Sequence, residues 1–230
     1  MRILGIDTSS RFNTVGLINN DQILADFIWE ARDNSLQKII LNIDLVLRSG
    51  GLTLADIDGL AIGIGPGSWT GVRVGVTVGK ILAYATNMPI CGVSSLDALA
   101  YQARDVPTLL CPLIDAGKEN VYAAFYRAQR GTIAKESEYY VGDIKKLLEG
   151  IREPTLFLGK AAHLYRQIIA EELGPLANYR GEDIQRGYVI ALLALPRLER
   201  GESDDTLSLA PLYLKESLAQ ALLDKEEKIK

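Results

Sequence analysis

One glycine-rich block constrains the fold of this chain more than any other stretch. Residues 65–75 read Gly-Pro-Gly-Ser-Trp-Thr-Gly-Val-Arg-Val-Gly, and they follow an apolar run over 57–64 that is typical of a buried strand. Glycines allow a tight turn and a close approach of backbone to a neighbour, because no Cβ intervenes. In an α/β protein a buried strand is usually followed by a turn and a helix. We therefore expect a strand over 57–64, a turn over 65–68 and a helix over 69–86.

The stretch 69–86 also carries a competing strand pattern. From Val72 to Val78 the apolar residues alternate with period two, which favours a strand. In contrast, small residues recur at every fourth position, and on a helix this spacing makes a smooth stripe against which another helix can lie closely. The residues of this stripe are Gly71, Gly75, Gly79 and Ala83. The order of elements favours the helix, and we interpret the stripe as a candidate helix-docking face.

The turn over 65–68 fits neither common phosphate-binding motif. No Gly-Lys-Ser/Thr follows at the spacing of a P-loop, and the third glycine of a dinucleotide fingerprint would fall at Thr70. The turn can still offer backbone N–H groups and a helix N-terminus to an anion, with Gly65, Gly67 and Ser68 as the residues involved. The alternative is a tight turn in which Ser68 caps the helix.

A second amphipathic helix is predicted over 34–49. Apolar residues fall at the spacing of one helical face, and Asn34 or Ser35 can cap the start of the helix. Leu41 and Leu45 lie off the main apolar face. A helix with a second apolar patch often has a second neighbour, which lies either in the same chain or in a partner.

The chain restarts after Pro107 in the manner of a duplicated fold. Residues 3–9 and 111–117 each place an aspartate, Asp7 or Asp115, at the end of an apolar strand that is followed by a turn of small residues. We interpret this repeat as two related α/β lobes. The expected units are an N-terminal lobe over 1–104, a C-terminal lobe over 105–206, and a tail over 207–230 that packs back on the body and is frayed at its end.

Charge and composition limit the classes of function. The net charge is −4 and no basic stripe is present, so contact with nucleic acid is expected through a partner rather than through this surface alone. Cys91 and Cys111 lie in apolar runs and form no disulfide framework, which suits a reducing cytosol. No stretch reaches the length of a membrane span and no signal peptide is evident, so a cytoplasmic protein is expected.

The single histidine, His163, excludes a zinc site built from several histidines of this chain, and we expect no metal site. No nucleophile motif surrounds it, so an ordinary helix position is expected rather than a catalytic base.

Asp7 and Asp115 are candidates for holding a metal–nucleotide complex between the lobes, with Thr8 and Ser9 beside them. The alternative is two aspartates that form turns by accepting backbone hydrogen bonds. Hydroxyls stand at Thr8 and Ser9, where phosphate-binding hairpins usually have glycine, and this weakens the nucleotide interpretation.

Several segments together resemble the TsaB (YeaZ) family. They are Ile6-Asp7-Thr8-Ser9, the block over 65–75, Gly92-Val93-Ser94-Ser95-Leu96, Ile114-Asp115 with Val121-Tyr122, and a weaker match at 210–215. The block over 65–75 is highly specific, and the others are supportive. The main resemblance is spread over residues 1–126, while residues 130–205 carry little signal.

The resemblance implies an α/β fold of the two-lobed actin-like, Hsp70-like (ASKHA) kind, each lobe a mixed sheet with flanking helices. It implies a non-catalytic scaffold or activator in the N6-threonylcarbamoyladenosine modification of tRNA at A37. Such a protein pairs with the catalytic paralogue TsaD, works with the TsaE ATPase, forms a homodimer when alone, and meets tRNA only through the complex. No cofactor is expected in the isolated chain, and ATP or ADP is a candidate at the junction with the partner.

In that family the two helices of the first lobe, here 34–49 and 69–86, pack against those of the partner. The interface residues that the resemblance implies are Leu36, Ile40, Leu41, Leu45, Gly71, Val72, Gly75, Val76 and Gly79. Two rival functions remain, which are a small ATP-dependent kinase of the actin-like fold and a peptidase. This chain departs from the family at 34–36, where Asn-Ser-Leu replaces the usual His-Ser-Glu, so the details of that helix end are open.

Overall fold

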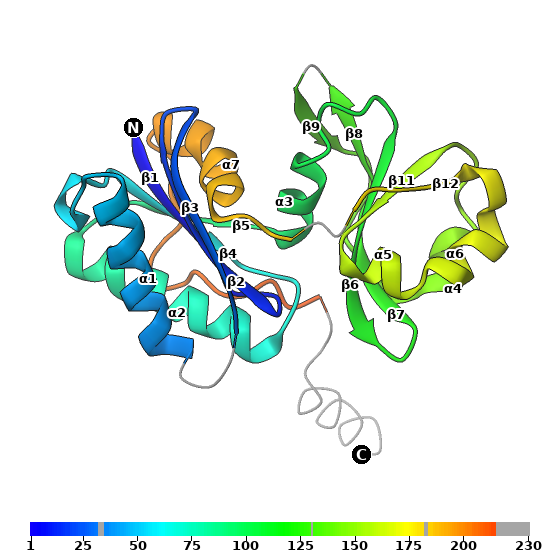
Figure 1. Ribbon diagram of the computed structural model, residues 1–230, viewed down its shortest axis with the longest axis horizontal. Helices are drawn as coiled ribbons and strands as arrows, with labels where there is room; N and C mark the ends of the chain where they lie inside the picture. The colour runs from blue at the N-terminus through cyan, green and yellow to red at the C-terminus, as the bar shows by residue number, and fades with distance from the viewer. Residues whose placement is uncertain (32–34, 130, 182–183, 215–230) are drawn as a thin grey trace, which may run out of the picture.

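The molecule consists of two mixed β-sheets with flanking helices, arranged as two lobes (Figure 1). The computed structural model describes residues 1–31, 35–129, 131–181 and 184–214, apart from the side chains of residues 35 and 36. Strands β1–β5 form the sheet of the first lobe, and strands β6–β12 form that of the second. This two-lobed α/β architecture confirms the fold class that the sequence predicts.

The first sheet has the strand order β3-β2-β1-β4-β5. Strands β1, β2 and β3 run antiparallel to their neighbours in this set, whereas β4 is parallel to β1 and β5 is parallel to β4. A tight turn at Asn20, whose φ is 52°, joins β2 to β3. The strand bounds are β1 (Arg2–Asp7), β2 (Phe12–Asn19), β3 (Gln22–Glu30), β4 (Gly59–Gly63) and β5 (Ile90–Val93).

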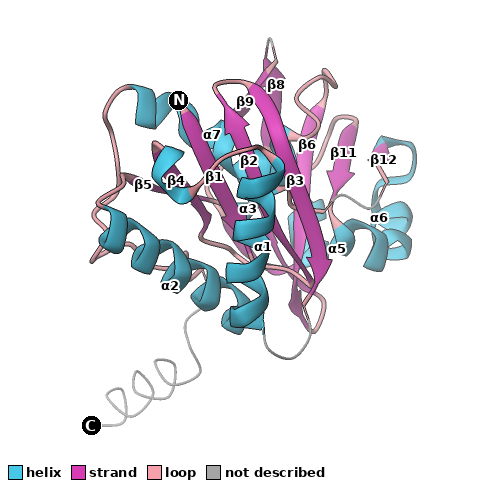
Figure 2. Cartoon of the chain, turned by 60° about the vertical axis from the view of Figure 1, so that its left-hand side comes forward, coloured by secondary structure: helices cyan, strands magenta, loops and turns pink. Residues whose placement is uncertain are grey.

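Helices cover both faces of the first sheet. The pleat of a strand sends successive side chains to opposite faces. In β1, Leu4 and Ile6 pack in the same cluster as side chains of α1 (Ser35–Ser49) and α2 (Trp69–Thr86), whereas Ile3 packs with α7 (Gly187–Glu199). Figure 2 shows α1 and α2 on the same side of the strands.

The helix interpretation of residues 69–86 is confirmed, in spite of the alternating valines. Ser68 caps α2, since its Oγ accepts a 3.2 Å hydrogen bond from the Gly71 N–H. Helix α1 begins at Ser35, and the predicted cap at Asn34 lies outside the described residues.

The second sheet repeats the plan of the first. Its order is β10-β7-β6-β11-β12, with the hairpin β8–β9 attached to β6, so β6 has the central place that β1 has in the first lobe. The duplication inferred from Asp7 and Asp115 therefore corresponds to two sheets of the same strand order. The bounds are β6 (Leu109–Gly117), β7 (Asn120–Ala123), β8 (Tyr126–Gln129), β9 (Thr132–Lys135), β10 (Tyr140–Asp143), β11 (Thr155–Leu158) and β12 (Ala177–Tyr179). The helices that flank it are α4 (Ile144–Leu148), α5 (Lys160–Leu164) and α6 (Arg166–Leu173).

Each lobe packs against one helix that belongs to the other lobe in chain order. Helix α3 (Ser95–Tyr101) follows β5 in the chain, yet its Leu96 and Ala100 pack in a cluster with Leu110 and Tyr126 of the second lobe. Helix α7 follows the second sheet, yet it packs on the first one. The two lobes as they pack in space therefore do not coincide with the chain segments divided at 104 and 206, because these two helices bury their apolar faces against the other lobe.

Residues 204–214, here named the C-terminal strap, run along α2 without forming a helix. The tail beyond Leu214, which was predicted to fray, lies outside the described residues. Among the described residues, no helix has both the length and the apolar character needed to cross a bilayer.

Candidate functional site

The glycine stripe of α2 faces the first sheet of its own lobe. A Cβ on Gly71 would lie 2.1 Å from the backbone oxygen of Thr8, and a Cβ on Gly75 would lie 2.3 Å from the Thr8 Oγ1. A Cβ on Gly79 would lie 2.5 Å from Ile62 in β4. These glycines let the helix axis approach the sheet closely.

Val72 and Val76 of α2 are buried beside this stripe, each with 4% of its surface exposed. Within the chain, Val72, Gly75, Val76 and Gly79 are buried and Gly71 is half-buried, so these positions already pack against their own lobe, and their contact with a partner stays a prediction. The spacing of four was interpreted correctly as a close-packing stripe, but its neighbour is the sheet of its own lobe.

An apolar surface does lie on the outer sides of α1 and α2, and it is named here the helix-pair face. On α1 the exposed fractions are 49% for Ile40, 67% for Leu41 and 49% for Leu45. On α2 they are 60% for Ile81 and 78% for Tyr84. Large apolar side chains that gather on one exposed face often mark a protein–protein interface.

The three residues of α1 were predicted from the sequence, and their contact with a partner stays a prediction. Leu36 belongs to α1, but its side chain lies outside the described part of the structure. Ile81 and Tyr84 were missed, although the signal was present, since they are large apolar residues that fall off the small-residue stripe.

The C-terminal strap binds beside the helix-pair face through backbone contacts. Lys80 Nζ donates hydrogen bonds to the carbonyls of Leu207, at 2.8 Å, and Leu209, at 3.0 Å. Farther along the strap, the Leu212 N–H donates to the Ile64 carbonyl at 2.8 Å. The strap is thereby fixed to both α2 and the end of β4.

The start of the strap is fixed by Asp204. Its carboxylate accepts hydrogen bonds from Arg197 at 2.7 Å and from the Gly92 N–H at 2.7 Å. Partial burial works against ionisation, but these donors hold the pKa of Asp204 below its usual value. The Asp204 N–H also donates to the Ile90 carbonyl at 2.8 Å, which covers part of the edge of β5.

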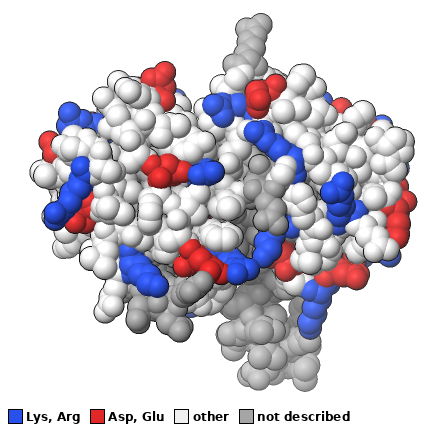
Figure 3. Space-filling view, viewed as in Figure 1, with Lys and Arg blue, Asp and Glu red and all other residues white. Residues whose placement is uncertain are grey.

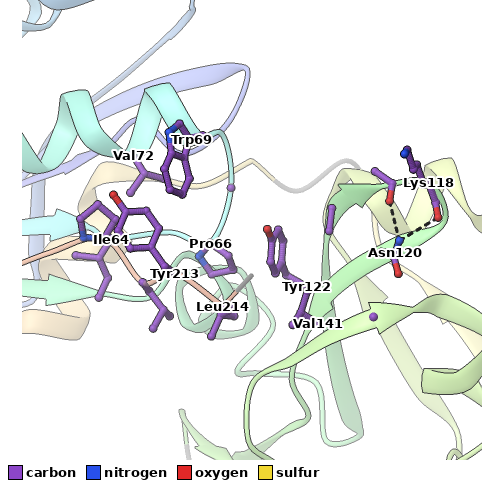
Figure 4. A pocket seen from close by; sticks show the side chains of 16 residues that line it. Ile64, Pro66, Trp69, Val72, Lys118, Asn120, Tyr122, Val141, Tyr213 and Leu214 are labelled. Carbon is purple, nitrogen blue, oxygen red and sulfur yellow. Dashed lines mark hydrogen bonds between the residues drawn. The ribbon is translucent and has the colours of Figure 1, made fainter. Parts of the chain in front are cut away.

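A cavity of about 1170 Å³ lies between the lobes and is named here the interlobe cavity. Figure 4 shows Trp69 and Tyr213 on one side of it and Tyr122 and Val141 on the other. Tyr213 of the strap lies against Trp69, with ring centroids 4.6 Å apart, and its hydroxyl accepts a 3.1 Å hydrogen bond from Arg73 Nε. The strap therefore forms one wall of this cavity.

The candidate anion-binding residues do not form one open site. Gly67 lines the interlobe cavity, and it also lines a second cavity of about 440 Å³ together with Ser9, Ser68 and Asp115. Asp7, Thr8 and Gly65 line neither of these two cavities.

Asp7 is buried in an internal hydrogen-bond network. Its Oδ1 accepts a 2.6 Å bond from the Ser9 N–H, and its Oδ2 accepts a 2.9 Å bond from the Ser95 hydroxyl. Ser9 Oγ lies 2.9 Å from Ser95 Oγ in the same network. Burial raises the pKa of Asp7, although the hydrogen bonds from Ser9 and Ser95 oppose that shift. This carboxylate ties the end of β1 to the start of α3.

Thr8 and Ser68 are also engaged within the chain. The Thr8 hydroxyl donates a 2.6 Å hydrogen bond to the Gly71 carbonyl, and the Ser68 N–H donates a 2.7 Å bond to the Ser9 carbonyl. Two of the groups that could bind a phosphate near the glycine-rich turn, the Thr8 hydroxyl and the Ser68 N–H, therefore already have partners within the chain.

Asp115 behaves as a turn-forming aspartate. Its Oδ1 accepts hydrogen bonds from the Gly117 N–H at 3.0 Å and from the Tyr165 hydroxyl at 2.7 Å. Burial, together with this carboxylate, raises the pKa of Tyr165 to about 12. In the described part of the chain, no three His, Cys, Asp or Glu side chains are grouped as a metal site would need. Both aspartates thus make the backbone and side-chain hydrogen bonds that the alternative interpretation, turn-forming aspartates, expects.

Charged groups on the rest of the surface form no continuous basic area in the view of Figure 3, where Lys and Arg alternate with Asp and Glu. Arg127, wherever the chain is viewed from, has its charge balanced by Glu136 and Glu153, at 2.7 and 2.9 Å. On that face the structure offers no extended cationic surface for a polyanion.

Known proteins resemble this chain in both architecture and sequence. Residues 29–219 match the family model described as TsaD, tRNA N6-adenosine threonylcarbamoyltransferase. The tRNA threonylcarbamoyladenosine biosynthesis protein TsaB of Bacillus subtilis (strain 168) is 31% identical to this chain over 224 residues. The match covers 96% of this chain and 97% of the Bacillus protein. YeaZ from Pseudomonas aeruginosa, which is 24% identical, superimposes with a TM-score of 0.79 over 93% of this chain and 99% of that one.

A more distant match concerns the fold alone. The activator of the 2-hydroxyisocaproyl-CoA dehydratase from Clostridium difficile, solved with bound ADPNP, has a TM-score of 0.52 at 11% identity over 87% of this chain and 97% of that chain. The fold is thus the actin-like one that the sequence predicts. The family model and the Bacillus protein both match well over half of the chain. On these grounds the chain belongs to the TsaB family of tRNA threonylcarbamoyladenosine biosynthesis proteins.

Proposed function

We propose that this chain is a non-catalytic subunit that binds a TsaD-like catalytic paralogue through the helix-pair face. The observation that carries this proposal is the exposure of five large apolar side chains on α1 and on the C-terminal half of α2, which are Ile40, Leu41, Leu45, Ile81 and Tyr84. Leaving such a surface in water is unfavourable, and covering it with the apolar face of another helix pair stabilises a complex. The partner class follows from the family of this chain, which acts in the biosynthesis of threonylcarbamoyladenosine in tRNA.

The polar residues favour a non-catalytic role for this chain. The carboxylates of Asp7 and Asp115 are engaged by neighbours in the same chain. Nε2 of His163 is buried and has no hydrogen-bond partner within the described residues, so no nucleophile–base pair involves this atom there. These observations favour neither the kinase nor the peptidase.

In this proposal the subunit acts by stabilising the active arrangement of its partner. Without the paralogue, the same face would bind a second copy of this chain. A TsaE-like ATPase completes the assembly, ATP or ADP binds at the junction with the paralogue and not to the isolated chain, and tRNA meets this chain only in the complex. The net charge of −4 agrees with indirect contact with tRNA.

The test is a reconstituted modification reaction. The TsaD-like and TsaE-like proteins from the same organism are incubated with tRNA, ATP and the threonylcarbamoyl donor, with and without this chain. Mass spectrometry of digested tRNA measures threonylcarbamoyladenosine. We expect product with the wild type and little product with Leu41→Glu, which places a charge in the helix-pair face. Equal product with and without the chain would contradict the proposal.

A further inference from the structure

We propose that the C-terminal strap extends the helix-pair face, and that Leu207 is a further contact for the TsaD-like paralogue. This inference rests on the proposed function, because it adds a residue to the same interface. It is carried by three observations on the strap, which concern its exposure, its attachment and its position next to α2.

Leu207 is an exposed apolar residue on a well-fixed turn. Its exposed fraction is 76%, close to the 78% of Tyr84. The turn is closed by two hydrogen bonds to Asp205, since its carboxylate accepts from the Ser208 N–H at 2.8 Å and its carbonyl accepts from the Leu209 N–H at 2.9 Å. A side chain presented on an ordered turn loses little conformational freedom when it is bound.

The strap points one leucine inward and the other outward. Leu209 packs against the core of the first lobe, whereas Leu207 faces solvent. Lys80 binds the carbonyls of both residues, and this amine is therefore the clamp that sets the position of the turn on α2. An apolar side chain that core packing does not need is available for a partner.

The position of Lys80 connects the strap to the helix-pair face. Residues four apart on a helix lie on the same side, one turn from each other. Tyr84 thus follows Lys80 on one side of α2, and Ile81 is the next residue in sequence. Leu207, held by Lys80, is placed beside the end of α2 that carries both exposed side chains.

The exposed apolar area of the helix-pair face is smaller than a standard interface needs, which favours an additional contact beside it. A large side chain has a surface of about 200 Å², so exposed fractions of 49–78% leave on the order of 600 Å² of these five residues uncovered. A standard interface buries about 800 Å² on each partner. Leu207, exposed to a similar degree, supplies part of that difference from the flank of α2.

Titration of the TsaD-like paralogue with variants of this chain tests the inference. We expect Leu207→Glu to weaken binding about tenfold, because it places a charge where the partner would cover an apolar side chain. The matched control is Leu164→Glu in the second lobe, where the leucine is 61% exposed, and its affinity should equal that of the wild type. Both variants should melt at the wild-type temperature, because each removes an exposed side chain.

A second variant separates the contact made by Leu207 from the positioning of the strap by Lys80. Lys80→Met removes both hydrogen bonds to the strap and leaves Leu207 in the sequence. We expect it to weaken binding, and we expect the double variant Lys80→Met/Leu207→Glu to bind no more weakly than Leu207→Glu alone, because a released strap no longer presents residue 207. Fully additive losses would contradict the role of Lys80 as the positioning residue.

The outcomes distinguish this inference from the function on which it rests. If Leu41→Glu loses binding while Leu207→Glu binds like the wild type, the strap inference is wrong and the proposed function stands. If Leu207→Glu weakens only self-association of this chain, the strap inference is also wrong. If the wild type does not bind the paralogue at all, the proposed function fails, and the strap inference fails with it.

Discussion

Gly75 of α2 lies so close to Thr8 at the end of β1 that a Cβ on residue 75 would stand 2.3 Å from the Thr8 Oγ1. The same hydroxyl donates a 2.6 Å hydrogen bond to the carbonyl of Gly71, one helical turn earlier. The two contacts fix α2 on the first sheet at a short distance. The small-residue stripe is thus a feature of folding, and the outer side of the same helix remains for partners.

Gly75→Ala should destabilise the chain by about 1–3 kcal/mol, the usual effect of overpacking a close contact. The physical reason is the overlap of the new methyl group with Thr8 Oγ1. The free energy of unfolding is measured by urea denaturation. Gly150→Ala is the matched control, since a Cβ there meets only the Leu147 carbonyl at 3.8 Å.

A double-mutant cycle locates the effect of Gly75→Ala at Thr8. Thr8→Ala removes the hydroxyl that the new methyl group would meet, so the double variant should be more stable than the sum of the two single changes predicts. Additive effects, or a Gly75→Ala variant as stable as the wild type, would show that the helix does not approach β1 as described.

Asp7→Asn should change how stability depends on pH. Burial raises the pKa of Asp7 above the ordinary value of about 3.9. Between the ordinary value and the raised one, the folded protein binds more protons than the unfolded chain, so the contribution of Asp7 to the free energy of unfolding falls as the pH rises. In total, the free energy of unfolding decreases by about 1.4 kcal/mol for each pH unit by which the pKa of Asp7 is raised.

The asparagine variant does not titrate at this position. The stability of Asp7→Asn relative to the wild type should therefore rise with pH from about pH 4, and become constant above the raised pKa. Urea denaturation at a series of pH values measures the difference. A difference that falls over this range would mean that the folded state favours the charged carboxylate.

The isolated chain should bind Mg²⁺–ATP no more tightly than a Kd of about 1 mM, which corresponds to about −4 kcal/mol. The reason is that Asp7, Thr8 and Asp115 are already hydrogen bonded within the chain. Calorimetric titration measures the affinity. A micromolar Kd would contradict this expectation, and Lys118→Ala would then show whether the interlobe cavity, which Lys118 lines, holds the nucleotide.

The elements near the glycine-rich block could be predicted from the sequence because the order strand, turn, helix decided between the two patterns that residues 69–86 carry. A buried strand, a turn capped by Ser68 and a long helix were each signalled by residue type and spacing, and the structure has all three. The repeated aspartate at Asp7 and Asp115 likewise pointed to two lobes, which the equal strand orders confirm.

The orientation of the stripe could not be predicted, because a spacing of four looks the same whether a helix or a sheet lies against it. Only the contacts of Gly71, Gly75 and Gly79 decide between these neighbours. The exchange of α3 and α7 between lobes was equally hidden, since both helices are apolar enough to pack on either sheet. The strap, which has no regular secondary structure, left no periodic signal.

The central claim is that the outer side of the α1–α2 pair, and not its glycine stripe, binds the catalytic paralogue. The most direct measurement is the calorimetric Kd of that paralogue for the wild type and for the double variant Leu41→Glu/Tyr84→Ser. Both residues are exposed, so the variant should fold normally. We predict binding at least about 100-fold weaker than that of the wild type, with Leu164→Glu unchanged. A double variant that binds as tightly as the wild type would contradict the account.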